Sequence, residues 1–336
     1  MTVAMVLLAY AVGVGTLGAR LLGRADWTGR APLLGIFTYL AAAWSVVAAL
    51  GLAGLTLAIH ATALGGALSQ LIGACVLRLR DTYATPGGMA AATAGLVLTA
   101  ALASRTVLTA ASHLRVTRRQ ALRHARTARL VGRPEPGLGA VLVDHAQPAA
   151  YCVAGRHPTV ILTTGALDVL APRQLDAVLA HERAHLAWRH HRLLALARIG
   201  RKALPFLPLM RDAEAQITRL VELHADDTAT KARDPRSLAT ALVVLATAGS
   251  DAAPVPASPS DSGPAPVPAP DTSPVLASAA TDAVQRVQRL LRPAEPLGGP
   301  QRMLLRAMAA VIVLGPLIMA LAPAVLALAL GRVPHA

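Results

Sequence analysis

The chain has 336 residues, of which 54% are hydrophobic and only 15% are charged. Aromatic residues make up 3%, so the apolar side chains are mostly Ala, Leu and Val, which suit long apolar helices. The formal net charge of +14 comes almost entirely from arginines that flank apolar stretches. The composition excludes an ordinary soluble globular protein, and the placement of the arginines favours a membrane surface over nucleic acid as partner.

Four apolar stretches are long enough to cross a bilayer, which takes about 20 residues of helix. The expected spans cover about residues 1–19, 31–58 and 85–110, and residues 303–336 hold the fourth span, Ala307 to Gly331, with a short external tail. The first stretch lacks a basic amino-terminal region and a small-residue cleavage site, so we interpret it as a retained span and not as a signal peptide.

The arginines predict the orientation of these spans. Seven arginines and no acid lie between Arg115 and Arg133, and such segments stay on the cytoplasmic side. The uncharged run from Ala31 to Leu77 could hold two crossings, but a second one would place these arginines outside. We therefore expect one crossing there, an external loop at 61–83, and both termini outside. Whether that loop re-enters the membrane stays open.

The residues between the third and fourth spans form the expected cytosolic part. Three short β-branched runs, GAVLVDH, AAYCVAG and PTVILTTG, predict strands. Helical patterns follow from Pro172 to Gly200, from Asp212 to Ala232, and from Ser237 to Ala248. Cys75 and Cys152 are expected on opposite sides of the membrane, which excludes a disulfide framework or a cysteine zinc site.

The domain boundaries follow from these patterns. Residues 1–112 form the membrane region and residues 113–249 a cytosolic α+β domain. Residues 250–274 are rich in Pro, Ala and Ser and are expected to be a disordered linker. Residues 275–302 carry an amphipathic helix of the same domain, before the last span.

The stretch HERAH fits the motif HExxH. His181 and His185 are four residues apart, so on a helix they share one face and can bind one metal ion. Glu182 stands beside the first histidine, where it can take a proton from water activated by zinc. The flanking apolar residues indicate a buried face, where an unpaired His-Glu-His set would be costly.

A third ligand is available in the stretch LVELHADDTA. Glu222 and Asp226 share a helix face, so Glu222 can complete the zinc site while Asp226 accepts the free ring N–H of a ligating histidine. Only 18 acidic residues occur in the chain, which makes this pair on an apolar helix conspicuous. The fold class that follows is a mainly α membrane protein with four transmembrane helices and a cytosolic α+β zincin-like metallopeptidase domain inserted between the third and fourth spans.

Other residues have a plainer interpretation. His190, His191 and His224 are expected to be ordinary, partly exposed histidines, and the alternative is a role in the transition state. Arg105 lies near the cytosolic end of the third span, where its side chain can reach the membrane surface. The strand of Thr159, Val160, Ile161 and Leu162 either binds an extended substrate by strand addition or is a plain core strand.

The sequence also resembles a known family. HERAH followed by ELHAD is similar to the HExxH…ExxxD pattern of gluzincins, and the stretch from Pro158 to His191 resembles the membrane metallopeptidases of the BlaR/MecR antirepressor type. The related HtpX and CAAX-prenyl-protease type shares much of it, but three spans before the domain and one after it favour BlaR/MecR. The resemblance implies one zinc ion per chain at His181, His185 and Glu222, with Glu182 as the catalytic base. It also implies a sensor domain beyond the last span, which this sequence lacks, so the involvement of β-lactams stays open.

We therefore expect a multi-pass zinc metalloendopeptidase that cuts a cytosolic protein such as a winged-helix transcriptional repressor. One alternative is a protease for the quality control of membrane proteins, and another is a non-catalytic signalling scaffold, which would have no need of Glu182. The expected partners are the substrate protein and the lipid bilayer, with no direct binding of nucleic acid.

Overall fold

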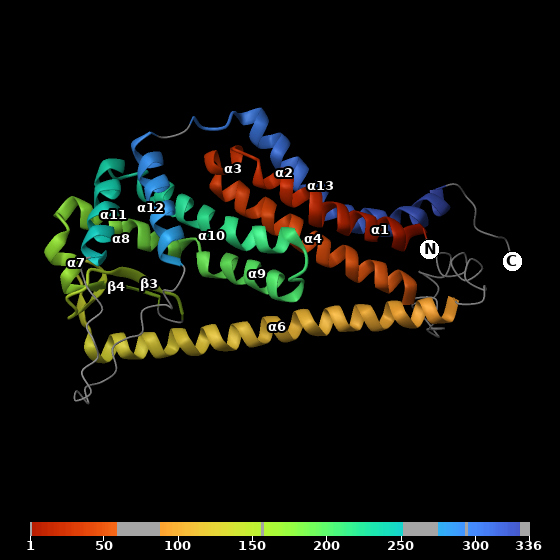
Figure 1. Cartoon of the computed structure of the whole chain (residues 1–336), viewed down its shortest axis with the longest axis horizontal. Helices are drawn as coiled ribbons and strands as arrows, with labels where there is room; N and C mark the ends of the chain where they lie inside the picture. Colours follow the sequence, from red (N-terminus) through yellow and green to blue (C-terminus); the bar gives the residue numbers. More distant parts are fainter. Residues whose placement is uncertain (1, 59–87, 156–157, 251–274, 293–294, 330–336) are drawn as a thin grey trace. The chain divides into compact units, whose positions relative to one another are not determined.

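The computed structural model describes residues 2–58, 88–155, 158–250, 275–292 and 295–329 (Figure 1). This part of the chain is mostly helical, with one small mixed sheet. The external loop expected at 61–83, Cys75 and nearly all of the linker expected at 250–274 lie outside the described residues. The chain divides into two compact units. The first comprises Met1–Ser112, Leu196–Ile217 and Leu297–Ala336, and the second comprises His113–Ala195 and Thr218–Pro296.

Among the described residues, four helical segments are long and apolar enough to cross a membrane, in agreement with the four expected spans. The first consists of α1 (Thr2–Gly13), a short π-helix η1 (Val14–Gly18) and α2 (Ala19–Gly23), and a short helix α3 (Trp27–Arg30) follows it. The other three are α4 (Pro32–Ala58), α6 (Gly88–Val131) and α13 (Gly299–Ala329). Large apolar side chains on α13 and α6 are exposed, as lipid-facing side chains would be.

Helix α6 extends farther than the third expected span. It runs without a break through the arginine-rich stretch to Val131. No Gly or Pro occurs between Leu96 and Val131, and the good helix formers Ala, Leu and Arg dominate, so the pattern offers no stop signal before Gly132. The basic segment is therefore a helical continuation of the span.

The spans of the first unit pack through small residues and buried polar groups. The hydroxyl of Tyr10 on α1 lies 3.0 Å from Ser45 Oγ on α4 and 2.8 Å from the carbonyl oxygen of Ile312 on α13. A Cβ at Gly54 would clash with Thr99, so α4 and α6 approach closely there. Such close approach and shared hydrogen bonds are what associate helices in an apolar solvent.

The first unit also contains a helical hairpin from the expected cytosolic part. It is formed by the second half of α9 (His190–Ala203) and the first part of α10 (Pro208–Ala229). A Cβ at Gly15 in the π-helix would lie 3.3 Å from Leu207 Cδ2, so the glycine admits the tip of the hairpin. Arg105 donates to the carbonyl oxygens of Ala203 (2.7 Å) and Lys202 (3.0 Å), so its guanidinium caps the end of α9 and has a defined partner within the protein.

The second unit contains a four-stranded sheet in the order β1-β2-β4-β3. Its strands are β1 (Arg133–Glu135), β2 (Ala140–Val143), β3 (Ala150–Val153) and β4 (Thr159–Thr163). Strands β2 and β4 are parallel, and the other pairs are antiparallel. The three predicted strands are present, whereas Arg-Pro-Glu carries no strand signal and β1 was missed.

Helices cover this sheet and enclose the core of the unit. They are α7 (Thr164–Val169), α8 (Pro172–Ala187), α11 (Pro235–Ser250) and α12 (Val275–Leu291). Leu162 of β4 packs with Val178 of α8, Leu238 of α11 and Leu290 of α12. The core thus draws on residues from both sides of the expected linker.

The strand-addition interpretation of Thr159, Val160, Ile161 and Leu162 is wrong. These residues form β4, which pairs with β2 on one side and with β3 on the other. From Ile161 onward the strand has a partner on both sides, so β4 is an inner strand of the sheet and not a free edge for a peptide. Val160, Ile161 and Leu162 are buried, so the alternative of a core strand is correct.

The single helix predicted from Pro172 to Gly200 is also wrong. Helix α8 ends at Ala187, and α9 begins at His190. Between them Arg189 has φ 51°, a left-handed conformation that often ends helices but is usually supplied by Gly. Because no Gly or Pro occurs there, the sequence carried no signal for the break.

Candidate metal centre

Helix α8 presents the HExxH residues from a buried position. The backbone N–H of Ala171 donates to Gln174 Oε1 (2.9 Å), and Pro172 opens the first turn, where its missing N–H costs nothing. Ala177, Val178 and Leu179 anchor the apolar face in the core. One turn later the Nε2 atoms of His181 and His185 lie 3.0 Å apart.

Helix α10 brings Glu222 to these two histidines. Its Oε2 lies 3.5 Å from His181 Nε2, and its Oε1 lies 3.7 Å from His185 Nε2. One ligand atom from each of the three residues lies within 4.8 Å of the other two. Zinc binds nitrogen and oxygen at about 2.0–2.2 Å in a tetrahedron, which places neighbouring ligand atoms about 3.3–3.5 Å apart. The distances of 3.0 to 3.7 Å bracket that spacing, so this donor set fits a zinc ion.

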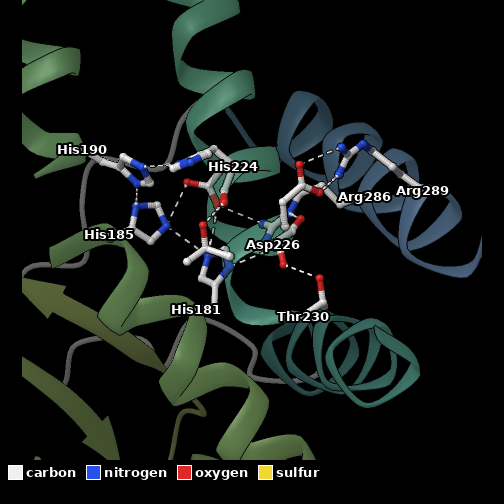
Figure 2. Close-up of polar contacts among 11 residues, drawn as sticks. His181, His185, His190, His224, Asp226, Thr230, Arg286 and Arg289 are labelled. Atoms are coloured by element: carbon white, nitrogen blue, oxygen red, sulfur yellow. Dashed lines mark hydrogen bonds and ion pairs between the residues drawn. The ribbon is translucent and has the colours of Figure 1, made fainter. Parts of the chain in front are cut away.

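Asp226 lies behind His181, away from the ligand atoms. Its Oδ1 is 3.0 Å from His181 Nδ1, and its side chain is only 1% exposed (Figure 2). Arg286 of α12 donates to both oxygens of the same carboxylate, at 2.8 and 2.7 Å. The carboxylate therefore fixes which ring nitrogen of His181 faces the metal site.

Arg286 is a site residue that sequence reasoning missed. Besides its two bonds to Asp226, it lies 3.1 Å from Glu222 Oε2. One turn farther along α12, Arg289 donates to both oxygens of Asp227, with one contact of 3.0 Å. The sequence predicts the amphipathic helix, and two arginines three residues apart lie on the same face of such a helix. The pattern did not show which acids they meet.

The expectation that His190 and His224 are partly exposed is wrong. Their exposed fractions are 1% and 7%, and both belong to a continuous series of ring contacts that starts at His185 (Figure 2). His185 Nδ1 lies 3.0 Å from His190 Nδ1, and His190 Nε2 lies 3.0 Å from His224 Nδ1. His191, by contrast, is exposed, as expected.

Glu182 lies between the metal-facing histidines and strand β3. It accepts hydrogen bonds from the backbone N–H and the thiol of Cys152. Burial and the negative charge of Glu222 raise its pKa, against the opposing effects of His181 and Cys152. Burial and Glu182 together raise the pKa of the Cys152 thiol to about 12, so this cysteine stays protonated at neutral pH.

The two histidines differ strongly in charge. Burial would lower the pKa of His181, but hydrogen bonds to Asp226 and Glu222 outweigh it and raise the pKa to about 9. Burial, with the positive charges of His181 and Arg286, lowers the pKa of His185 to about 4. Burial would raise the pKa of Glu222, yet the hydrogen bond from His181 and the charge of Arg286 lower it to about 2. At neutral pH the metal-free site therefore holds a charged His181, a neutral His185 and an ionised Glu222.

A helix with two histidines four residues apart, joined by a glutamate from a second helix, defines a metallopeptidase site of the gluzincin class. The model of peptidase family M48 matches residues 115–293, which is more than half of the chain. The chain therefore belongs to peptidase family M48, a family of zinc metallopeptidases. No curated protein and no solved structure matches significantly.

The matched region begins in the arginine-rich part of α6 and ends just after α12. It thus includes the three ligand candidates, Asp226 and also Arg286. The match supports the expected membrane-type zinc metallopeptidase, while the narrower BlaR/MecR type is not decided by it.

Replacing Arg286 by Ala should weaken zinc binding about 10–100-fold, because the outer partners of metal ligands typically contribute that much. It should also lower the free energy of unfolding by about 3–5 kcal/mol, since the buried Asp226 carboxylate would lose the guanidinium that donates to both of its oxygens. Arg289→Ala is the matched control, because Arg289 lies one turn along α12 and pairs with Asp227. Competition with a chromophoric chelator and chemical denaturation measure the two effects. Equal loss of zinc affinity in both variants would contradict the assignment.

Zinc binding should release about one proton at about pH 7.5, because His181, with a pKa of about 9, must lose its Nε2 proton. His185 is already neutral and should contribute none. Zinc affinity should therefore increase about tenfold per pH unit from pH 7 to about 9 and then level off. Titration calorimetry in buffers of different protonation enthalpy measures the release. Asp226→Asn should lower it, and an affinity independent of pH over this range would refute the charge assignment.

Proposed function

We propose that this protein is a multi-pass membrane zinc endopeptidase that hydrolyses peptide bonds of a protein substrate. The observation that carries the proposal is the convergence of His181, His185 and Glu222 within 4.8 Å, with Glu182 directly beside them on α8. Glu182 argues against the scaffold alternative, because a structural metal site has no use for a buried carboxylate beside its ligands.

The residues have distinct roles in this proposal. His181, His185 and Glu222 hold the ion, and Asp226 with Arg286 orients His181. Zinc, when bound, supplies Lewis acidity that makes water acidic near neutral pH and polarises the carbonyl of the scissile peptide. Glu182 takes the proton from the attacking water and passes it to the leaving nitrogen. Its raised pKa, caused by burial, suits a group that must both accept and donate a proton.

Strand β3 replaces β4 as the proposed binding strand for the substrate. It pairs with β4 on one side, and among the described residues no strand pairs with its other side. That side is turned toward the site, because the backbone N–H of Cys152 donates to Glu182. An extended peptide added along β3 would bring its backbone to the catalytic base.

We further propose that the substrate is cytosolic and that the enzyme acts as an antirepressor, cutting a winged-helix repressor. The positive-inside distribution of arginines supports the cytosolic side. The course of α9 and α10 supports a signalling role, since each helix has one part in the unit of the spans and another in the unit of the site. Quality control of membrane proteins is the second candidate, and the M48 match is compatible with both.

Wild-type protein purified in detergent should contain one zinc per chain, and Glu182→Gln should keep the zinc but lose proteolysis by at least about 10³-fold, as removal of an essential acid–base group does. New peptide amino termini should then be compared between cells with wild type and with Glu182→Gln. Fragments of a soluble DNA-binding protein would support the antirepressor role, and fragments of membrane proteins would support quality control. Absence of zinc, or equal cleavage by Glu182→Gln, would overturn the endopeptidase.

The sidedness has its own test, in a Cys75→Ser/Cys152→Ser background. A membrane-impermeant maleimide should label Thr2→Cys in intact cells, because the amino terminus is proposed to lie outside. It should label Arg236→Cys, an exposed position at the start of α11, only after permeabilisation. Labelling of Arg236→Cys in intact cells would place the peptidase domain on the external side.

A further inference from the structure

The buried histidines behind His185 form a connected series with no role in the reaction described above. His185 Nδ1, His190 and His224 Nδ1 follow one another at 3.0 Å per contact. His190 is 1% exposed and is bonded through both of its ring nitrogens. We propose that His190, supported by His224, is a positioning residue that holds His185 in the tautomer and ring orientation that bind the metal. The inference rests on the proposed zinc site.

The positions of the hydrogens in this series follow from the requirement that His185 binds the metal through Nε2. His185 faces His181 and Glu222 with Nε2, so metal binding there requires the hydrogen of His185 on Nδ1. His190 must then accept that hydrogen at its own Nδ1, and it carries its hydrogen on Nε2. His224 in turn accepts at Nδ1 from His190. Metal binding at His185 thus allows one arrangement of the two hydrogens shared among the three rings.

The fold reaches this arrangement through the helix break at Arg189. On an uninterrupted helix His190 would be rotated about 140° from His185, because successive residues turn by about 100°. The left-handed Arg189 ends α8 and brings the first residue of α9 back to His185. Such backbone conformations are rare for non-glycine residues and gather at functional sites. The break is thus what makes the contact possible.

The series also connects the three helices around the site. His185 belongs to α8, His190 to α9, and His224 to α10, two residues after Glu222. Trp188 closes the turn and packs edge-on against His224, with ring centroids 4.8 Å apart. The two histidine ligands therefore have different partners behind them: His181 contacts the ionised Asp226, and His185 contacts the neutral imidazoles of His190 and, through it, His224.

A simple packing role is the competing explanation, and it predicts the opposite ranking of two variants. His190→Phe keeps a ring of similar volume but removes the acceptor. His190→Asn loses volume but keeps an oxygen near the position of Nδ1. Positioning predicts that His190→Phe weakens zinc binding about 10–100-fold and that His190→Asn binds zinc more tightly than His190→Phe. A packing role predicts that His190→Asn, which leaves a gap, binds zinc more weakly than His190→Phe.

The experiment uses the full chain in detergent, with zinc affinity measured against a chromophoric chelator. The visible spectrum of the cobalt(II) form is the second readout, and its bands should shift in His190→Phe but stay close to wild type in His190→Asn. His191→Phe, at the exposed neighbouring position, should bind both metals as the wild type does. The pair His224→Phe and His224→Asn should show the same ranking, which keeps the test decisive if one His190 variant does not fold.

The outcomes separate this inference from the proposed function. Wild-type zinc binding that is unchanged in His190→Phe, or a ranking in which Asn is worse than Phe at both positions, would overturn the positioning role and leave the zinc site standing. A wild-type chain that binds no zinc would overturn the site and the positioning role together. Tighter binding of both zinc and cobalt(II) by His190→Asn than by His190→Phe would establish His190 as the residue that positions His185.

Discussion

The buried carboxylate of Asp226 is the constraint on which the rest of the site depends. A carboxylate that is 1% exposed would be very costly without partners, and it finds them in His181 of α8 and Arg286 of α12. Because Asp226 itself lies on α10, this one group links three helices. It contacts the candidate metal ligand His181 directly, and it holds Arg286, which lies 3.1 Å from Glu222. Helix α12, about 60 residues farther along the chain, is therefore part of the candidate metal centre.

The membrane imposes the second constraint. Polar groups in and beside the spans need partners within the protein, and Tyr10 and Arg105 find them in backbone carbonyls. Arg105 caps α9, and Gly15 admits Leu207 at the tip of the α9–α10 hairpin. The first part of α10 belongs to the hairpin that packs with the spans, and its later part carries the candidate ligand Glu222.

Much of the fold could be predicted from local patterns. Membrane spans can be recognised because a run of about 20 apolar residues is rare outside a bilayer. Three of the four strands can be recognised because their β-branched runs are bounded by turn residues. The order of the strands could not be predicted, since pairing depends on contacts between distant segments. For that reason the sequence leaves β4 open as either a substrate-binding strand or a core strand, and only its pairing with β2 and β3 decides for the core strand. The break at Arg189 was hidden for a related reason: tertiary contacts favour a conformation that the local sequence does not.

The sequence by itself determined the chemistry available to this protein. The spacing of His181 and His185 places two imidazoles on one helix face, and the spacing of Glu222 and Asp226 does the same for two carboxylates. These are short-range relations, decided by the geometry of a single helix. Only the tertiary structure decided what surrounds them: the pairing of Arg286 with Asp226, the position of Cys152 beside Glu182, and the burial of His190 and His224 behind His185. Each of these depends on how separate helices and strands pack, and the side-chain pattern of one element does not contain that information.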